Sequence, residues 1–213
     1  MNTGRNSTNL DVTQVTSDIL SEFLEVAFHS ILYTRELYPA GIFERRKKYN
    51  VPIQMSTHPD VNQYIIATIQ SLKPLLDKHT ADRVCMTILD GSSRPTEKFV
   101  FEIASATACD FSEDMYLVRL EDALRAFLLK LNICDAILTT NPQECSWCIQ
   151  VHTTEIAYAD MKQTPKAQEF TWVEAEREQT YMGESSMLPL KSVDNAVVKM
   201  QLYVEENTSR KKT

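Results

Sequence analysis

The chain has 213 residues, of which 43% are hydrophobic and 24% charged, enough for one domain with a substantial core. Its net charge of -7 argues against direct binding to nucleic acid, because the phosphates would repel it. The glycines are scattered, which argues against a phosphate-cradling loop, and the lack of a long apolar run argues against a membrane span. The 5 cysteines are irregularly spaced, which argues against a disulfide framework and favours a reducing compartment.

Two helices are expected in the first third of the chain. The first runs from Val15 to Tyr38 and is ended by the proline that follows; its wide apolar surface predicts burial on several sides. The second begins at Pro59, and Pro74 should kink or end it. Between them lie a basic run, Arg45–Lys48, and a short extended piece, Val51 to Met55. We interpret the run as a loop or as one half of a charged protein interface.

Two strands and a third helix follow. Alternating apolar residues predict strands at Val84 to Leu89 and Phe99 to Ile103, and the turn formers between them indicate a β-hairpin. Ser112 is a suitable capping residue for the third helix, which should end before Asn141-Pro142.

The C-terminal third of the sequence is more polar and less regularly patterned than the rest. A strand is expected from Cys145 to Thr153, but Glu155 to Val193 is polar and only sparsely anchored by apolar residues. Val198 to Val204 alternates again as a final strand. A long, weakly anchored segment that ends in a well-formed strand resembles a strap laid across a domain, and such a segment should open at a low cost in free energy.

Cys145 and Cys148 form a CxxC motif, with His152 downstream. A zinc site would need further ligands, and four residues along a strand would hold Cys148 and His152 about 13 Å apart. We therefore interpret these thiols as packed in or beside a sheet, with no metal and no cofactor. A small cysteine-dependent enzyme that uses Cys145 or Cys148 stays open as an alternative, whereas His29 fits core packing or a hydrogen bond.

Six longer strings carry a resemblance to a known family. They are Phe23–Ala27, Arg35–Phe43, Arg46–Pro52, Glu97–Glu102, Leu124–Phe127 and Lys199–Glu206. Together they resemble the HORMA-domain accessory subunits of translesion DNA polymerase zeta, and the likeness runs from about Val15 to Glu206.

The resemblance implies an α+β HORMA fold, with three helices packed on an antiparallel sheet and a C-terminal safety belt. A single domain would span residues 12–206, with the core at about 12–154, the belt at about 155–206, and flexible tails at 1–11 and 207–213. In this family the belt has an open and a closed position, and it traps a partner peptide against the core. Release requires the belt to move, so dissociation should be slow.

The family's functional residues map onto three groups of positions. The peptide pocket maps onto Tyr64 and Trp172, and Glu174 stands where the family has an aliphatic residue. The interface with the C-terminal domain of a Y-family scaffold polymerase maps onto Met187, Leu190, Lys191, Lys199, Gln201 and Tyr203. In that interface Met187 replaces a leucine, and Tyr203 is expected to be exposed. A self-association surface maps onto Arg45, Arg125 and Ala136.

The implied function is that of a non-catalytic adaptor which joins the catalytic subunit of polymerase zeta to the scaffold polymerase. The resemblance also implies roles in double-strand break repair through shieldin subunits, inhibition of the anaphase-promoting complex through its activators, and remodelling by an AAA+ ATPase. It implies a homodimer and a location in the nucleus, with the cytoplasm and the spindle as further sites. No direct contact with nucleic acid or with a membrane is expected. The alternative within the fold is a spindle-checkpoint HORMA protein.

Overall fold

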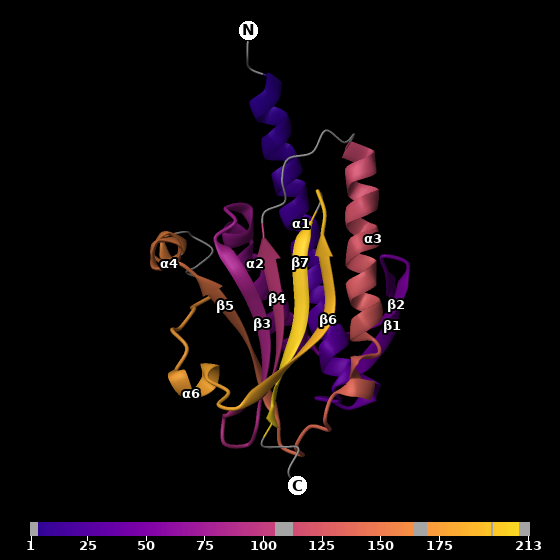
Figure 1. Cartoon of the computed structure of the whole chain (residues 1–213), viewed down its shortest axis with the longest axis vertical. Helices are drawn as coiled ribbons and strands as arrows, with labels where there is room; N and C mark the ends of the chain where they lie inside the picture. Colours follow the sequence, from indigo (N-terminus) through magenta and orange to yellow (C-terminus); the bar gives the residue numbers. More distant parts are fainter. Residues whose placement is uncertain (1–3, 105–112, 164–169, 197, 209–213) are drawn as a thin grey trace.

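A five-stranded antiparallel sheet, with long helices against one side, forms the body of the molecule (Figure 1). The computed structural model describes the chain except for residues 1–3, 105–112, 164–169, 197 and 209–213. The strand order is β5-β3-β4-β7-β6, which confirms the expected α+β class. The strands are β3 (Ala81–Leu89), β4 (Pro95–Ala104), β5 (Ser146–Thr153), β6 (Ser185–Asp194) and β7 (Lys199–Asn207).

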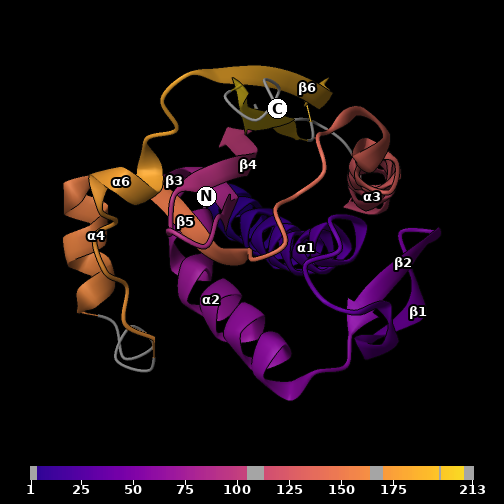
Figure 2. The same ribbon diagram turned by 90° about the horizontal axis from the view of Figure 1, so that it is seen from below.

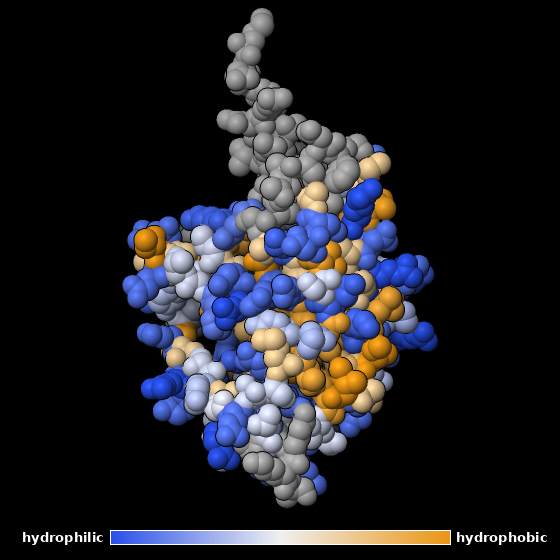
Figure 3. All heavy atoms as spheres, viewed as in Figure 1, coloured by the Kyte–Doolittle hydropathy of each residue, from blue (hydrophilic) through white to orange (hydrophobic). Residues whose placement is uncertain are grey.

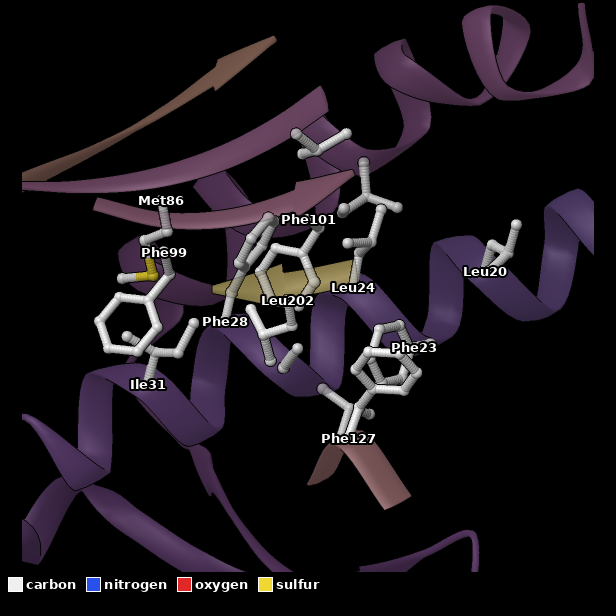
Figure 4. Packing of buried hydrophobic residues seen from close by; sticks show 14 of the residues in the cluster. Leu20, Phe23, Leu24, Phe28, Ile31, Met86, Phe99, Phe101, Phe127 and Leu202 are labelled. Atoms are coloured by element: carbon white, nitrogen blue, oxygen red, sulfur yellow. The ribbon is translucent and has the colours of Figure 1, made fainter. Parts of the chain in front are cut away.

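The long helices are α1 (Gly4–Thr34), α2 (Pro59–Asp77) and α3 (Glu113–Leu131). Seen from below, α1 runs through the middle of the molecule between α2 and α3 (Figure 2). The Phe23 ring of α1 packs edge-on at 6.0 Å from both Phe101 of β4 and Phe127 of α3 (Figure 4). The first helix is thus buried on several sides, as its apolar surface predicts. None of the described helices is both long and apolar enough to cross a membrane.

The first helix ends at Thr34, so the prediction that it continues to the residue before the proline is wrong. Glu36 has a φ of +53°, and the amide of Leu37 donates to the carbonyl of Leu32 at 3.1 Å. This Schellman arrangement closes the helix by satisfying its last carbonyls. The start of α1 also places part of the expected N-terminal tail in the helix.

The second helix runs through Pro74 and ends at Asp77, so of the two outcomes expected at this proline, a kink or an end, the end is wrong. Leu75 and Leu76, directly behind the proline, are each 3% exposed. Burying a leucine contributes about 1.5–3 kcal/mol, which offsets the cost of about 3 kcal/mol for a proline inside a helix. The core contacts of the last turn therefore decide the length of this helix.

The basic run is a strand, so its interpretation as a loop is wrong. β1 (Phe43–Lys48) pairs with β2 (Val51–Ser56) in a separate two-stranded hairpin. Tyr49 and Asn50 join them with φ values of +45° and +58°, as in a two-residue turn that suits the twist of a hairpin. The side chains of β1 are largely exposed and charged, so the strand lacks the apolar alternation that would have predicted it.

The third helix ends at Leu131, well before Asn141, and is followed by the short 3-10 helix η2 (Cys134–Ile137). The predicted β3–β4 hairpin and the strand β5 are confirmed. Ser112, the predicted cap of the third helix, lies outside the described residues.

The C-terminal segment (residues 155–206) contains more regular structure than its composition indicates. It holds α4 (Glu155–Lys162), α6 (Arg177–Thr180) and the edge strand β6, and it ends in β7, which lies between β4 and β6 and confirms the predicted last strand. The sequence analysis missed β6. The strand contains Pro189, a residue confined to edge strands and bulges, and its register shifts between Pro189 and Lys191.

A buried ion pair ties the end of α1 to the sheet. Arg35 is 4% exposed, and its Nε atom donates to a carboxylate oxygen of Glu97 on β4 at 2.9 Å. The same guanidinium contacts Asp135 and the carbonyl of Thr139. Glu97 is directly opposite Glu206 of β7, and both glutamates are fully buried. The Arg35 guanidinium therefore supplies positive charge to an acidic part of the core, where an uncompensated charge is expensive.

His29 is 2% exposed, and its Nδ1 accepts a hydrogen bond from the amide of Ser56 at 3.3 Å. Burial, assisted by the nearby Arg46, lowers the pKa of His29 from 6.5 to about 4. The unfolded chain then binds a proton that the folded one rejects, so the contribution of His29 is complete above pH 6.5 and is lost as the pH falls toward 4.

We expect this loss to reach up to about 3 kcal/mol of unfolding free energy. Denaturant unfolding of the wild type and of His29→Gln between pH 7 and pH 4.5 measures it, because the variant lacks this titration. The wild-type curve should fall more steeply, and parallel curves would contradict the assignment.

Candidate functional site

The C-terminal segment passes from one edge of the sheet to the other. After the edge strand β5, α4 packs beside α2 with Ala157 and Met161 buried. The chain then passes α6 and forms β6 at the opposite edge, so that it spans the molecule in Figure 1 from the left side to the right. Such a path places an extended stretch of the segment alongside β5.

Strand β5 presents an edge to this stretch. Among the described strands it pairs with β3 alone. On its outer side the amide of Ile149 donates to the phenol oxygen of Tyr64 at 3.3 Å. An edge of this kind can accept an added strand through main-chain hydrogen bonds.

Four half-buried aromatic side chains gather beside that edge. Tyr64 of α2 lies 5.2 Å from Trp147 of β5 and 6.2 Å from Phe170, measured between ring centroids, and Phe170 lies 5.1 Å from Trp172. The Trp172 indole donates to Ser71 Oγ at 3.0 Å, which holds the C-terminal segment against α2. The cluster thus offers flat apolar rings next to an open strand, a combination suited to proline and other apolar side chains of an extended peptide.

The structure brings the two predicted pocket residues into this one cluster, with Phe170 between them. Burial raises the pKa of Tyr64, so its hydroxyl stays protonated at neutral pH. Glu174 lies on the same stretch of chain as Trp172, but its side chain is exposed.

Trp147 and Phe170 are the members of the cluster that the resemblance did not supply. In the sequence, the alternation of the expected strand puts Trp147 on one face with Ile149 and Val151, and Phe170 is an isolated apolar residue in a polar stretch. Neither signal predicts which aromatic rings contact one another, because these contacts join residues far apart in the sequence. The phenol of Tyr38, which accepts from the Trp147 indole at 3.0 Å, had no sequence signal.

The predicted scaffold-interface residues lie on β6 and β7. Met187 and Gln201 are exposed, but Tyr203 is only 7% exposed, so the expectation that it is exposed is wrong. Its ring packs with Cys85 and Val100 in a small apolar cluster on the outer face of the sheet.

The pairing of β6 with β7 places the other predicted scaffold-interface residues on two different faces of the sheet. Lys199 is exposed and lies two residues from Gln201, so the two share a face of β7. Lys191 pairs with Leu202, which is 1% exposed, and Leu190 packs partly buried against the main core. Lys191 and Leu190 therefore belong to the side of the sheet that faces α3, whereas Met187 and Gln201 face outward.

The predicted self-association residues lie on three elements, with Arg45 on β1, Arg125 on α3 and Ala136 in η2, and all three are exposed. Arg45 lines a surface pocket together with Asn132, the residue after α3. Hydrophobic residues gather on the right of the surface in Figure 3, where Figure 1 draws α3 and β6. The exposed apolar side chains at the end of α3 and after it are Leu129, Ile133 and Ile137.

Three of the described cysteines, Cys85, Cys134 and Cys148, have the environment of packed thiols. Burial raises the pKa of Cys85 and of Cys134 to about 12 and also raises that of Cys148. A nucleophilic cysteine needs a lowered pKa, so these three are poor nucleophiles. Within the described part of the chain, no three metal-ligating side chains gather into a site, and His152 lies on a strand with Cys148.

A family model described as HORMA domain matches residues 16–200. The chain belongs to the HORMA family. Human mitotic spindle assembly checkpoint protein MAD2B is 47% identical over 202 residues, covering 95% of this chain and 96% of the relative. The DNA polymerase zeta processivity subunit of Arabidopsis thaliana is 28% identical over 186 residues, covering 87% of this chain and 83% of the relative. The family indicated by the sequence strings is thereby confirmed.

Solved HORMA structures share the fold at low sequence identity. A chain of the crystal structure of the mitotic checkpoint complex matches with a TM-score of 0.76 and 19% identity, covering 92% of this chain and 96% of that chain. The structure of Caenorhabditis elegans HTP-2 bound to the HIM-3 closure motif matches with a TM-score of 0.66 and 9% identity, covering 89% of each. This likeness supports the arrangement of helices and strands in this HORMA domain.

Proposed function

We propose that this HORMA domain is a non-catalytic adaptor that traps a partner peptide between β5 and its C-terminal segment, which acts as a safety belt. The carrying observation is the open edge of β5 beside the cluster of Tyr64, Trp147, Phe170 and Trp172. A peptide would add a strand to β5 and place apolar side chains among the rings, and the segment would have to move to release it.

The partner we propose for this pocket is a proline-containing peptide of the polymerase zeta catalytic subunit. A related protein is named as the processivity subunit of this polymerase, and flat rings pack well on proline. The outer face of β6 and β7 would bind the C-terminal domain of a Y-family scaffold polymerase. Shieldin subunits, activators of the anaphase-promoting complex, an AAA+ ATPase and a second copy of this chain are further proposed partners, and the proposed location is the nucleus.

A second candidate function is peptide capture in the spindle checkpoint. It is favoured by the name of the human relative, which describes a mitotic spindle assembly checkpoint protein. Both functions use the same pocket, so the identity of the bound peptide separates them.

An adaptor must bind the polymerase peptide in its pocket and the scaffold domain on β6 and β7 at the same time. We expect the chain loaded with the polymerase peptide to bind the scaffold domain, as measured by calorimetry of the sequential titrations. Met187→Glu, at an exposed position of β6, should weaken the scaffold contact by about tenfold or more and leave peptide capture unchanged. Ile156→Glu, at a position 77% exposed on α4, is the matched control. Mutually exclusive binding of the two partners would contradict an adaptor.

A further inference from the structure

The C-terminal segment is pinned where it crosses the outer face of the sheet. Lys98 of β4 is 6% exposed, and its Nζ donates to the carbonyl of Thr180 at 2.9 Å. Thr180 is the last residue of α6, and Met182 just beyond it is 6% exposed. The crossing is therefore packed down on the sheet rather than suspended above it.

The same lysine also meets the end of the segment. Lys98 is directly opposite Glu205 in the β4–β7 register, and its Nζ lies 4.0 Å from a Glu205 carboxylate oxygen. The two contacts lie far apart along the segment, one in its crossing and one in its final strand. The contact with Thr180 requires α6 to lie across the sheet, and the contact with Glu205 requires β7 to be paired with β4.

A second donor aligns the crossing. Gln150 of β5 donates from Nε2 to the carbonyl of Gln179 at 3.0 Å, while its Oε1 accepts from the hydroxyl of Thr87 at 3.0 Å. Thr87 is fully buried, so the amide of Gln150 is held in one orientation. Two adjacent carbonyls of α6 thus receive hydrogen bonds from two different strands.

These contacts depend on one another because the ammonium group of Lys98 is out of water. A buried charge is tolerated when hydrogen bonds and an opposite charge replace its hydration. Thr180 and Glu205 supply that replacement, and both belong to the segment. If α6 lifts, the ammonium group keeps only the Glu205 carboxylate, and if β7 unpairs, it keeps only the Thr180 carbonyl.

We propose that Lys98 locks the C-terminal segment in its closed position, with Gln150 as the aligning donor. The inference rests on the proposed function in that the segment acts as a belt. Because Lys98 joins the crossing to the closing strand, release of either part weakens the hold on the other. The lock lies on the face of the sheet away from the helices and outside the aromatic cluster, so it acts on the retention of a peptide rather than on its recognition.

Hydrogen exchange of the full-length, peptide-free chain tests the lock without requiring any partner. In Lys98→Met the amides of Gln179 and Tyr181, which donate within and just after α6, should exchange at least about tenfold faster than in the wild type. The amides of β3 should remain within about twofold. Lys73→Met, which removes an ion pair between α2 and Asp18 of α1, is the matched control and should change neither region.

Glu205→Gln keeps the Thr180 hydrogen bond and provides a milder variant, expected to give an intermediate acceleration. For a chain loaded with the polymerase peptide, Lys98→Met should speed peptide dissociation about tenfold and leave the association rate within twofold. Unchanged exchange at Gln179 and Tyr181 would overturn the lock, and so would an equal acceleration in β3. Failure of the peptide to bind at all, with the local acceleration present, would instead count against the proposed function and leave the lock supported.

Discussion

Replacing Arg35 with methionine is expected to lower the free energy of unfolding by about 3–5 kcal/mol. The guanidinium is buried and bonds Glu97, which is fully buried and directly opposite Glu206. Methionine fills a similar volume but supplies no charge and no donor. The carboxylate of Glu97 would then lose the ion pair and the hydrogen bond that Arg35 supplies, and the carbonyl of Thr139 would lose a donor.

Chemical denaturation followed by circular dichroism measures this loss. Arg83→Met is the matched control, because Arg83 pairs with Glu102 on the solvent-exposed part of the same sheet. Exposed ion pairs contribute about 0–1 kcal/mol. A loss below about 1 kcal/mol for Arg35→Met would show that the buried carboxylates do not need this cation.

Removing either predicted pocket ring should weaken peptide capture by about 2 kcal/mol or more, close to thirtyfold in affinity. Tyr64→Ala removes the ring that meets both Trp147 and Phe170, and Trp172→Ala removes the ring that meets Phe170 and Ser71. Each change opens one wall of the proposed pocket. Fluorescence anisotropy with a labelled, proline-containing peptide of the polymerase catalytic subunit gives the affinities.

The controls separate the pocket from general loss of structure. Tyr181→Ala removes an aromatic ring from the same segment, at a position that is 66% exposed, and should bind like the wild type. Tyr64→Phe keeps the ring and loses only the hydroxyl that accepts from Ile149, so it should retain most of the affinity. Normal binding by both alanine variants, with unchanged circular dichroism, would exclude this cluster as the pocket.

The pocket and the lock on Lys98 predict different kinetic signatures. Loss of a pocket ring removes contacts with the peptide itself, whereas loss of the lock changes how readily the segment lifts. Variants of Lys98 should therefore alter dissociation with little change in the choice of peptide. Variants of Tyr64 or Trp172 should alter that choice, because their rings would meet the peptide's side chains.

Local pattern predicted most of the elements and mispredicted several boundaries. The helical periodicity around Phe23 and the alternation around Val84 both reflect burial on one face, and the spacing of apolar residues in the sequence reveals such burial. The ends of the helices depend on other contributions to the free energy, namely backbone turns and the burial of neighbouring side chains. The end of α1 follows from a backbone turn at Glu36, and the end of α2 follows from burial of the leucines after Pro74.

Apolar spacing was enough to predict the class of fold, and the long shared strings were enough to predict the family and to single out Tyr64 and Trp172, which the structure brings into one aromatic cluster. Three features became visible only in the folded chain: Tyr203 is buried, Arg45 lies on a strand, and Lys98 contacts both the crossing and the end of the C-terminal segment. These features join residues far apart along the chain. Their energies arise from pairing, burial and charge neutralisation between elements, and no local pattern encodes them.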